Sequence, residues 1–217
     1  MLDVKALKEE RTQLFEDIYN GIIPKRVPVM AGMSTEFCIE YAGLPLAETQ
    51  WTLKGLAEAY DAICQLVKSD TLPAGGQEKS PAVLLKFLNS KGYAMSSSGY
   101  IQHRDITTLE ASEYDDFINA PYDFMMEKVI PRMFTALDSD PVTRSLALAK
   151  AYKAYFDHAA EIGKICRDLI SKHGYYVPPP NSVGTVRAPF DLLGDFMRGV
   201  KGIYTDVRRC PEKVIAA

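Results

Sequence analysis

Three short apolar runs, separated by longer helical patterns, constrain the fold of this 217-residue chain most strongly. The runs are residues 27–30, 93–95 and 175–177, and each lies next to glycine, serine or proline. Strands that alternate with helical segments predict a parallel sheet with the helices outside it. A closed eight-stranded barrel needs about twice as many strands. The chain is therefore expected to be α/β, the N-terminal half of a (β/α)8 TIM barrel.

The helical patterns carry clear start and stop signals. The longest begins at Asp140 and Pro141, a capping residue followed by proline at the first helical position. Its apolar residues recur at steps of three and four, and it ends at Gly174. Ser34 is expected to cap a helix that follows it. The other helices are expected over residues 4–18, 35–41, 53–67, 81–88, 110–118 and 121–137.

Charge and cysteine content argue against nucleic-acid binding, membrane binding and a disulfide framework. The formal net charge is −3, the pI is near 5.7, and no basic stripe interleaves with aromatic residues, so neither nucleic acid nor membrane binding is expected. The four cysteines fit neither a disulfide framework nor a cysteine-based zinc pattern, which favours a reducing cytoplasm. The charged N-terminus is no signal peptide, and no apolar run approaches the roughly 20 residues that span a bilayer.

The last thirty or so residues predict two further helices. Pro189 suits the first turn of one helix, Gly199 and Gly202 interrupt that helix, and Pro211 opens the second. The final helix lacks a capping glycine or asparagine, so the chain is expected to stop inside a barrel. The expected organisation is one domain over residues 1–217, with a leading helix in residues 1–25 and the first barrel strands and helices in residues 26–217.

The turn Ala188-Pro189-Phe190-Asp191-Leu192-Leu193 resembles the Gly/Ala-Pro-aromatic-Thr-Leu turn of the uroporphyrinogen decarboxylase superfamily. The resemblance implies a (β/α)8 barrel whose ligand cleft lies at the C-terminal ends of the strands, and a tetrapyrrole or corrinoid ligand. The chain is most similar to a divergent branch near the corrinoid and coenzyme M methyltransferases. Further short motifs that carry the resemblance are residues 70–73, 99–103, 113–116, 131–132, 197–203 and 209–212.

Departures from the family pattern bear on the reaction. True decarboxylases carry two arginines after the first strand, which clamp substrate carboxylates, whereas residues 29–35 contain no arginine here. The tyrosine expected after the Ala-Pro turn falls near Asp195 instead. The resemblance therefore favours corrinoid-linked methyl transfer, with decarboxylation of uroporphyrinogen in porphyrin biosynthesis as the alternative reaction.

The methyltransferase branch activates a thiol with zinc held by a His-x-Cys pair and a later cysteine. The 217 residues contain no such pattern. No metal or cofactor is therefore expected within this chain, and zinc and a corrinoid would belong to a complete protein. His158, within a helix, and His173, at a helix end, are expected to be structural.

The resemblance implies a set of site residues in the cleft. Asp70 and His103 would be the catalytic groups, and Gln102, Arg187 and Asp195 would bind substrate. Asp70 could accept hydrogen bonds from pyrrole N–H groups, His103 could act as a base, and Arg187 could hold an anionic group. Structural roles stay open for the same residues: a turn or cap for Asp70, a loop position for His103, and a cap or ion pair for Arg187.

A non-catalytic role is the alternative from another functional class. A half barrel leaves one sheet edge unpaired and one apolar face uncovered, which predicts self-association or a partner that completes the barrel. The chain would then be a binding or assembly module. In the enzymatic alternatives the partner is a small molecule, which would be a tetrapyrrole, a corrinoid or a methylated substrate.

Overall fold

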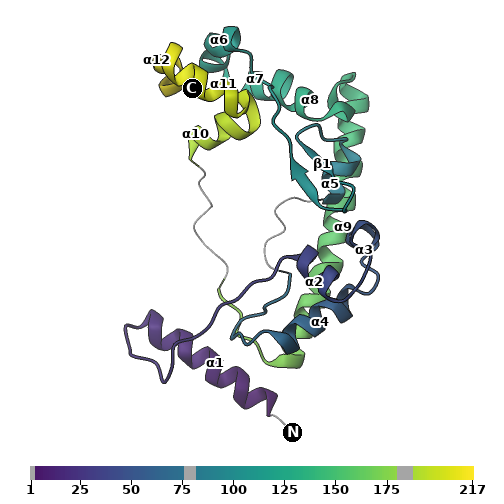
Figure 1. The fold of residues 1–217 in the computed structure, drawn as a ribbon, viewed down its shortest axis with the longest axis vertical. Coiled ribbons are helices and arrows are strands. Elements are labelled where there is room, and N and C mark those ends of the chain that lie inside the picture. The colour runs from purple at the N-terminus through teal and green to yellow at the C-terminus, as the bar shows by residue number, and fades with distance from the viewer. Residues whose placement is uncertain (1–2, 76–81, 180–187) are drawn as a thin grey trace. The chain divides into compact units, whose positions relative to one another are not determined.

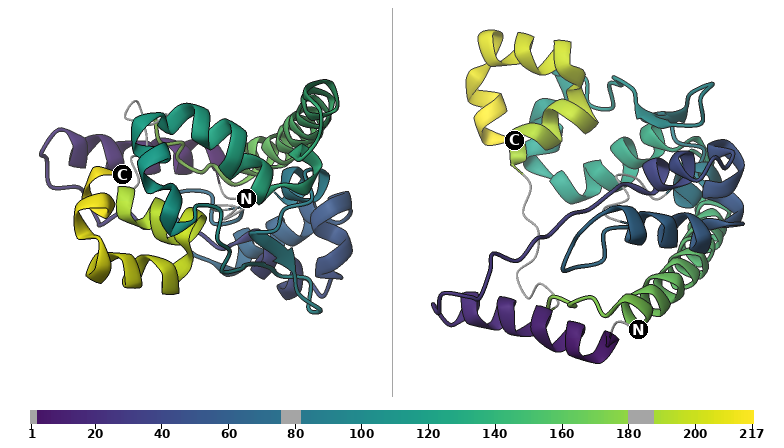
Figure 2. Two further views of the ribbon diagram at one scale, coloured as in Figure 1. Left: turned by 90° about the horizontal axis from the view of Figure 1, so that it is seen from above. Right: turned by 60° about the horizontal axis from the view of Figure 1, so that its bottom comes forward.

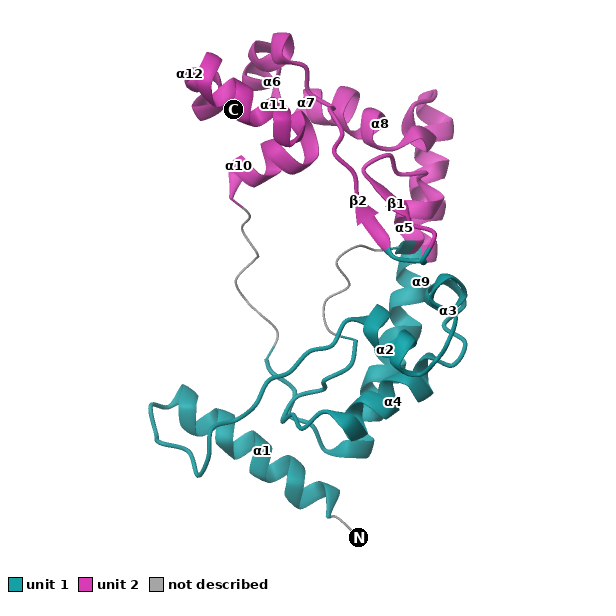
Figure 3. Ribbon diagram, viewed as in Figure 1, with its two compact units in different colours: residues 1–82, 98–100, 155–182 teal, residues 83–97, 101–154, 183–217 magenta. Residues whose placement is uncertain are grey.

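The computed structural model describes residues 3–75, 82–179 and 188–217, which form two compact units (Figure 3). Helices dominate both units (Figure 1). Helix α9 (Pro141–His173) is one uninterrupted helix and contributes residues to both (Figure 2). Unit 1 comprises Met1–Ala82, Ser98–Tyr100 and Tyr155–Ser182, and unit 2 comprises Val83–Ser97, Ile101–Ala154 and Val183–Ala217.

Two helices of unit 1 begin at residues whose side chains accept hydrogen bonds from first-turn backbone groups. Asp3 accepts hydrogen bonds from two first-turn N–H groups of α1, and Ser34 accepts one from the N–H of Phe37 in α2. Leu53 and Gly55 adopt positive φ values of 58° and 79°, which separates α3 from α4. Besides the C-terminal half of α9, the described helices of this unit are α1 (Val4–Tyr19), α2 (Thr35–Tyr41), α3 (Leu46–Thr52) and α4 (Leu56–Leu66).

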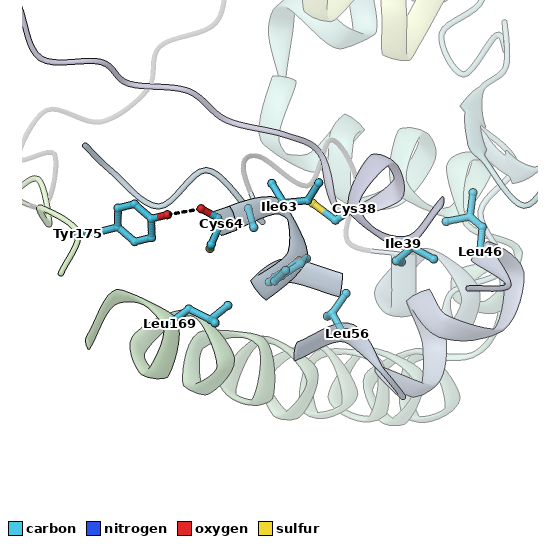
Figure 4. Close-up of a cluster of buried hydrophobic side chains, with 10 residues drawn as sticks. Cys38, Ile39, Leu46, Leu56, Ile63, Cys64, Leu169 and Tyr175 are labelled. Carbon is cyan, nitrogen blue, oxygen red and sulfur yellow. Dashed lines mark hydrogen bonds between the residues drawn. The ribbon is translucent and has the colours of Figure 1, made fainter. Parts of the chain in front are cut away.

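The core of unit 1 lies between α2, α4 and the C-terminal half of α9 (Figure 4). Tyr60 and Ile63 of α4 are fully buried, and Leu169 of α9 packs in the same cluster. The hydroxyl of Tyr175 donates to the carbonyl of Cys64 at 3.2 Å, which satisfies the one polar atom that this side chain brings into the core.

Three extended segments of unit 1, around residues 29, 70 and 176, lie side by side and are joined by a few backbone hydrogen bonds. The N–H of Asp70 donates to the carbonyl of Val29 at 2.8 Å, and the N–H of Tyr176 donates to the carbonyl of Asp70 at 2.8 Å. Thr71 and Tyr176 form an isolated parallel bridge. These contacts hold residues 29, 70 and 176 together without forming a regular strand in the described residues.

Unit 2 has two apolar clusters. The larger one joins Leu109, Tyr114 and Phe117 to Met197 and Ile203, and the smaller one surrounds Leu88, Leu137 and Ala151. The described elements of this unit, with the N-terminal part of α9, are α5 (Ala82–Phe87), β1 (Tyr93–Met95), β2 (Ile101–His103), η1 (Ala111–Glu113), α6 (Tyr114–Asn119), α7 (Pro121–Phe124), η2 (Met125–Val129), α8 (Ile130–Met133), η3 (Thr135–Leu137), α10 (Pro189–Leu192), η4 (Leu193–Arg198), α11 (Gly199–Arg209) and α12 (Pro211–Ala216).

The expected N-terminal half of a TIM barrel with parallel strands is wrong. Among the described residues the sheet consists of β1 and β2, which pair antiparallel with Tyr93 opposite His103. The connection from β1 to β2 is only residues 96–100, which suits a hairpin, whereas a parallel pair needs a crossover of a dozen or more residues. The expected strand at residues 27–30 does not form. The N–H groups of Val29 and Ala31 donate to the side chains of Asp70 and Ser69, and the hydroxyl of Ser69 donates to the carbonyl of Val29. Side chains therefore take the place of a neighbouring strand's backbone.

Helix predictions from local signals are confirmed at several ends. Helix α2 covers the predicted residues 35–41, and α9 begins after Asp140 and ends before Gly174. The predicted helix over residues 53–67 begins only at Leu56, and α3 was not predicted. None of the described helices combines the length and the apolar character that a bilayer crossing requires.

Candidate functional site

A pocket of about 460 Å³ lies in unit 1 beside Asp70. Its walls come from α1, the extended segment after α1, the C-terminal end of α4 with the residues that follow, and the C-terminal end of α9. Three lining side chains are cationic and one is anionic, so an anion fits the electrostatics of the pocket better than a cation does. The lining residues are Leu7, Arg11, Arg26, Val29, Cys64, Gln65, Val67, Lys68, Ser69, Asp70, His173 and Tyr175.

Asp70 is 4% exposed and is held by charge-assisted hydrogen bonds. Arg26 donates from Nη1 to Oδ2 at 2.7 Å and from Nη2 to Oδ1 at 2.6 Å, a bidentate pair. The N–H of Val29 donates to Oδ2 at 2.8 Å, and Nε of Arg11 lies 3.4 Å from Oδ1. The hydrogen bonds from Arg26 lower the pKa of Asp70 against the opposing effect of burial, and the N–H of Val29 lowers it further.

The contacts of Asp70 limit what it can do chemically. An ionised carboxylate offers about four acceptor sites, and Arg26 and the N–H of Val29 fill three of them here. Arg11 adds a positive charge at 3.4 Å without a hydrogen bond. With a lowered pKa, Asp70 is ionised at neutral pH and has no proton to donate. The side chain of Arg26 is 41% exposed, and its Nε also lies 3.5 Å from Oε1 of Glu10. Arg26 is therefore the member of the pair with Asp70 that is more open to an incoming ligand.

Arg11 connects α1 to the end of α9. Its Nη1 donates to the carbonyls of His173 and Gly174 at 2.7 and 2.9 Å, and its guanidinium lies 4.7 Å from the ring centroid of Tyr175. These carbonyls belong to the C-terminal end of α9, where a positive charge is favourable. Arg11 is therefore mainly a structural contact, although it lines the pocket.

His173, which lines the same pocket, forms a pair with Asp61. The Nε2 of His173 lies 2.6 Å from Oδ1 of Asp61, and Nζ of Lys172 donates to Oδ2 of Asp61 at 2.8 Å. Hydrogen bonds from Lys172 and then from His173 lower the pKa of Asp61. Gln65 of α4 donates to the same carboxylate at 3.0 Å.

The other predicted site residues do not lie at this pocket. Gln102 and His103 are exposed on β2, and the ring of His103 lies 5.0 Å from that of Tyr93 and 5.7 Å from that of Phe196. Asp195 precedes Phe196 in η4 and is exposed. These residues belong to unit 2, whereas Asp70 belongs to unit 1. Arg187 lies outside the described residues.

Unit 2 contains a buried ion pair of its own. Arg198 donates from Nε to Oδ2 of Asp206 at 2.5 Å and from Nη1 to the carbonyl of Leu109 at 2.6 Å. The hydroxyl of Tyr114 donates to the same carboxylate at 3.1 Å, and burial raises the pKa of Tyr114, so that this hydroxyl stays neutral. The pair joins η4 to α11 and to the segment before α6, which is a structural function.

The described residues do not fit a zinc ion. No group of three or more histidine, cysteine, aspartate or glutamate side chains in them is arranged to hold a metal. Burial raises the pKa values of Cys38 and Cys64, which keeps both as thiols, whereas zinc binds thiolates. No zinc-dependent step is therefore assigned to this part of the chain.

The sequence predicted Asp70 as a site residue but did not predict the residues that contact it. Arg11 and Arg26 lie 59 and 44 positions away in the sequence, and the Asp61–His173 pair spans 112 positions. Only the fold of unit 1 brings them together, so no local motif could have pointed to them.

No protein-family model matches the chain, and neither does any curated protein or solved structure.

Proposed function

We propose that the chain binds a carboxylate-bearing tetrapyrrole or a corrinoid in the Asp70 pocket and performs corrinoid-linked methyl transfer. The observation that carries the proposal is the guanidinium of Arg26, which is partly exposed at a pocket with an excess of cationic side chains. The ligand class and the reaction rest on the sequence motifs that resemble the family, and Asp70 belongs to one of them.

Each pocket residue has a separate part in this proposal. Arg26 binds a ligand carboxylate with its fork of N–H donors, in exchange for part of its contact with Asp70. Lys68 supplies a second, more flexible cation at the exposed rim. Asp70 stays ionised throughout and orients Arg26, so no proton transfer is assigned to it.

Decarboxylation of uroporphyrinogen is the second candidate, and one observation favours it. The sequence segment in which true decarboxylases carry two arginines has none here, but Arg26, from outside that segment, lines the Asp70 pocket with a partly exposed side chain. One carboxylate clamp is therefore available from another position of the chain.

Activity assays on purified protein separate the two reactions. Methyl transfer from a methylated corrinoid to a thiol supports the first candidate, and loss of CO₂ from uroporphyrinogen supports the second. In either case Arg26→Gln is expected to lower kcat/KM by about tenfold or more, because a charge-assisted contact to substrate is lost.

Lys25→Gln is the matched control, since Lys25 is the neighbouring exposed cation and does not line the pocket. It is expected to leave kcat/KM unchanged. Absence of both activities, or equal losses in the two variants, would contradict the enzymatic proposal.

An assembly role is supported by a different observation. Side chains in residues 22–30 leave much apolar surface exposed, with Ile23 at 93% and Val27 at 80%. We propose a second copy of this chain as the partner of this segment, since such surface favours association. Light scattering across a range of concentrations tests it: Ile23→Ser is expected to weaken self-association, and a monomer at all concentrations would exclude it.

A further inference from the structure

His173 lines the pocket, but the proposed function assigns it no part. It closes α9 and lines the Asp70 pocket, and its side chain is 22% exposed. Its contact with Asp61 uses only one of the two ring nitrogens. Among the described residues, no hydrogen bond is made by Nδ1 of His173.

The contact with Asp61 determines where the proton of a neutral His173 resides. Asp61 is ionised at neutral pH, because Lys172 and His173 donate to it. A carboxylate only accepts hydrogen bonds, so Nε2 must carry the hydrogen of the 2.6 Å contact. In the neutral ring Nδ1 is then the basic nitrogen, which is the way in which a carboxylate fixes the tautomer of a catalytic histidine.

Cationic side chains outnumber carboxylates in the lining of the pocket that His173 shares. Arg11 of α1 binds the carbonyl of His173, which places a fixed positive charge at this end of the pocket. An incoming carboxylate offsets that charge. The titratable and charged groups that face His173 or share its pocket are Arg11 from α1, Asp61 and Cys64 from α4, Lys172 from α9, Arg26 from the segment after α1, Lys68 and Asp70 from the segment after α4, and Tyr175.

We propose that binding of a ligand carboxylate in this pocket is coupled to protonation of His173 at Nδ1, with Asp61 as the residue that positions the ring. This inference rests on the proposed function, since it requires a carboxylate-bearing ligand in the same pocket. A proton from solvent forms a bond to Nδ1 when the carboxylate arrives, and Nε2 keeps its hydrogen. The imidazolium then donates to Asp61 on one side and to the ligand on the other.

Calorimetric titration with uroporphyrin III in two buffers of different ionisation enthalpy measures the protons taken up on binding. The wild-type protein is expected to take up roughly half a proton or more per ligand near pH 7, where imidazole side chains change charge. His173→Gln is expected to abolish this uptake, and Asp61→Asn to reduce it. His158→Gln is the control, because His158 lies on the same helix away from the pocket lining, and it should leave the uptake unchanged.

A second measurement does not depend on substitution of His173. The chain has three histidines, so comparison of wild-type, His103→Gln and His158→Gln proteins assigns the imidazole NMR signals of His173 by elimination. Uroporphyrin III is expected to move the titration midpoint of this signal to higher pH. An unmoved midpoint overturns the inference.

The outcomes separate this inference from the proposed function. Binding that depends on Arg26, with equal proton uptake by wild-type and His173→Gln proteins, overturns the inference and leaves the proposed function standing. Absence of Arg26-dependent binding overturns both.

Discussion

Asp70 joins segments of unit 1 that lie far apart in the sequence. Its carboxylate binds Arg26 and the N–H of Val29, and its backbone pairs with Val29 on one side and Tyr176 on the other. The same guanidinium that satisfies this buried carboxylate is exposed at the pocket. Arg26 can turn from Asp70 toward a ligand only if the carboxylate keeps another hydrogen bond, and the N–H of Val29 supplies one.

Asp70→Asn is expected to destabilise unit 1 by about 2–3 kcal/mol, because it removes a charge from a hydrogen-bonded network with little exposure. Denaturant unfolding monitored by the fluorescence of Trp51, the single tryptophan, measures the loss. Glu10→Gln is the control, since the side chain of Glu10 is 40% exposed and lies 3.5 Å from Nε of Arg26. If Asp70→Asn lowers the free energy of unfolding no more than Glu10→Gln does, the hydrogen bonds of Asp70 contribute little to the stability of unit 1.

Glu113 is expected to make the stability of unit 2 depend on pH in the acidic range. Hydrogen bonds from Arg132, at 2.6 and 2.8 Å, are the main cause that lowers the pKa of Glu113 to about 2. A carboxylate whose folded pKa is lowered stabilises the fold above its unfolded pKa and loses this effect as the pH falls toward the folded value. Glu113→Gln should therefore lower the free energy of unfolding by about 1–2 kcal/mol above roughly pH 5 and have little effect near pH 2.

Asp115→Asn provides the comparison for that pH series. Asp115 pairs with Lys213 at the surface of the same unit, and a solvent-exposed pair adds little to stability. No measurable change is expected at any pH. A Glu113→Gln effect that is the same at pH 2 and pH 7 would contradict the assignment to charge.

Helix ends explain how α1 and α9 meet within unit 1. Gly174 follows α9 with φ of +63°, and a Cβ there would lie 2.6 Å from the carbonyl oxygen of Val4. Gly21 follows α1 with φ of +71°, but a Cβ there would meet nothing within 4 Å. The two glycines therefore share a backbone conformation and differ in the space around them.

Gly21→Ala is expected to cost about 1 kcal/mol through backbone strain alone. Gly174→Ala should cost at least about 1 kcal/mol more, because the backbone of α1 would have to move away from the added carbon. Thermal or denaturant unfolding of the two variants measures the difference directly. Equal losses would show that the close approach of α1 to Gly174 does not exist in solution.

The elements that the sequence predicted well are those whose signals are local. Ser34, and Asp140 with Pro141, mark the starts of α2 and α9 through contacts within one turn, so the sequence alone places these ends. Strand pairing depends on residues that are distant in the sequence. The connection after β1 is too short for the expected parallel pairing, so β1 and β2 form an antiparallel hairpin. The candidate site shows the same division: a motif predicted Asp70 as a site residue, which stays a prediction, whereas only the fold brings Arg26 and His173 to the same pocket.

At the scale of the molecule, each unit has its own apolar clusters. The members of the cluster around Tyr60 all belong to unit 1, and those around Tyr114 and Leu137 all belong to unit 2. Local opening of one unit is therefore expected to leave the core of the other intact.

Hydrogen exchange on Asp70→Asn tests this independence. Amides of α2 and α4 are expected to exchange faster than in the wild-type protein, while amides of α6 and α11 keep their rates. Equal acceleration in both units would mean that they unfold as one cooperative body.

The central claim is that the Asp70 pocket binds a carboxylate-bearing ligand through Arg26, and an equilibrium fluorescence titration with uroporphyrin III tests it most directly. Saturable binding is predicted for the wild-type protein, with an affinity about 10- to 100-fold lower in Arg26→Gln, as expected for the loss of a charge-assisted contact. Lys25→Gln, at the adjacent cation outside the pocket lining, should stay within about twofold of the wild type. Failure of the wild-type protein to bind, or the same weakening in both variants, would contradict the claim.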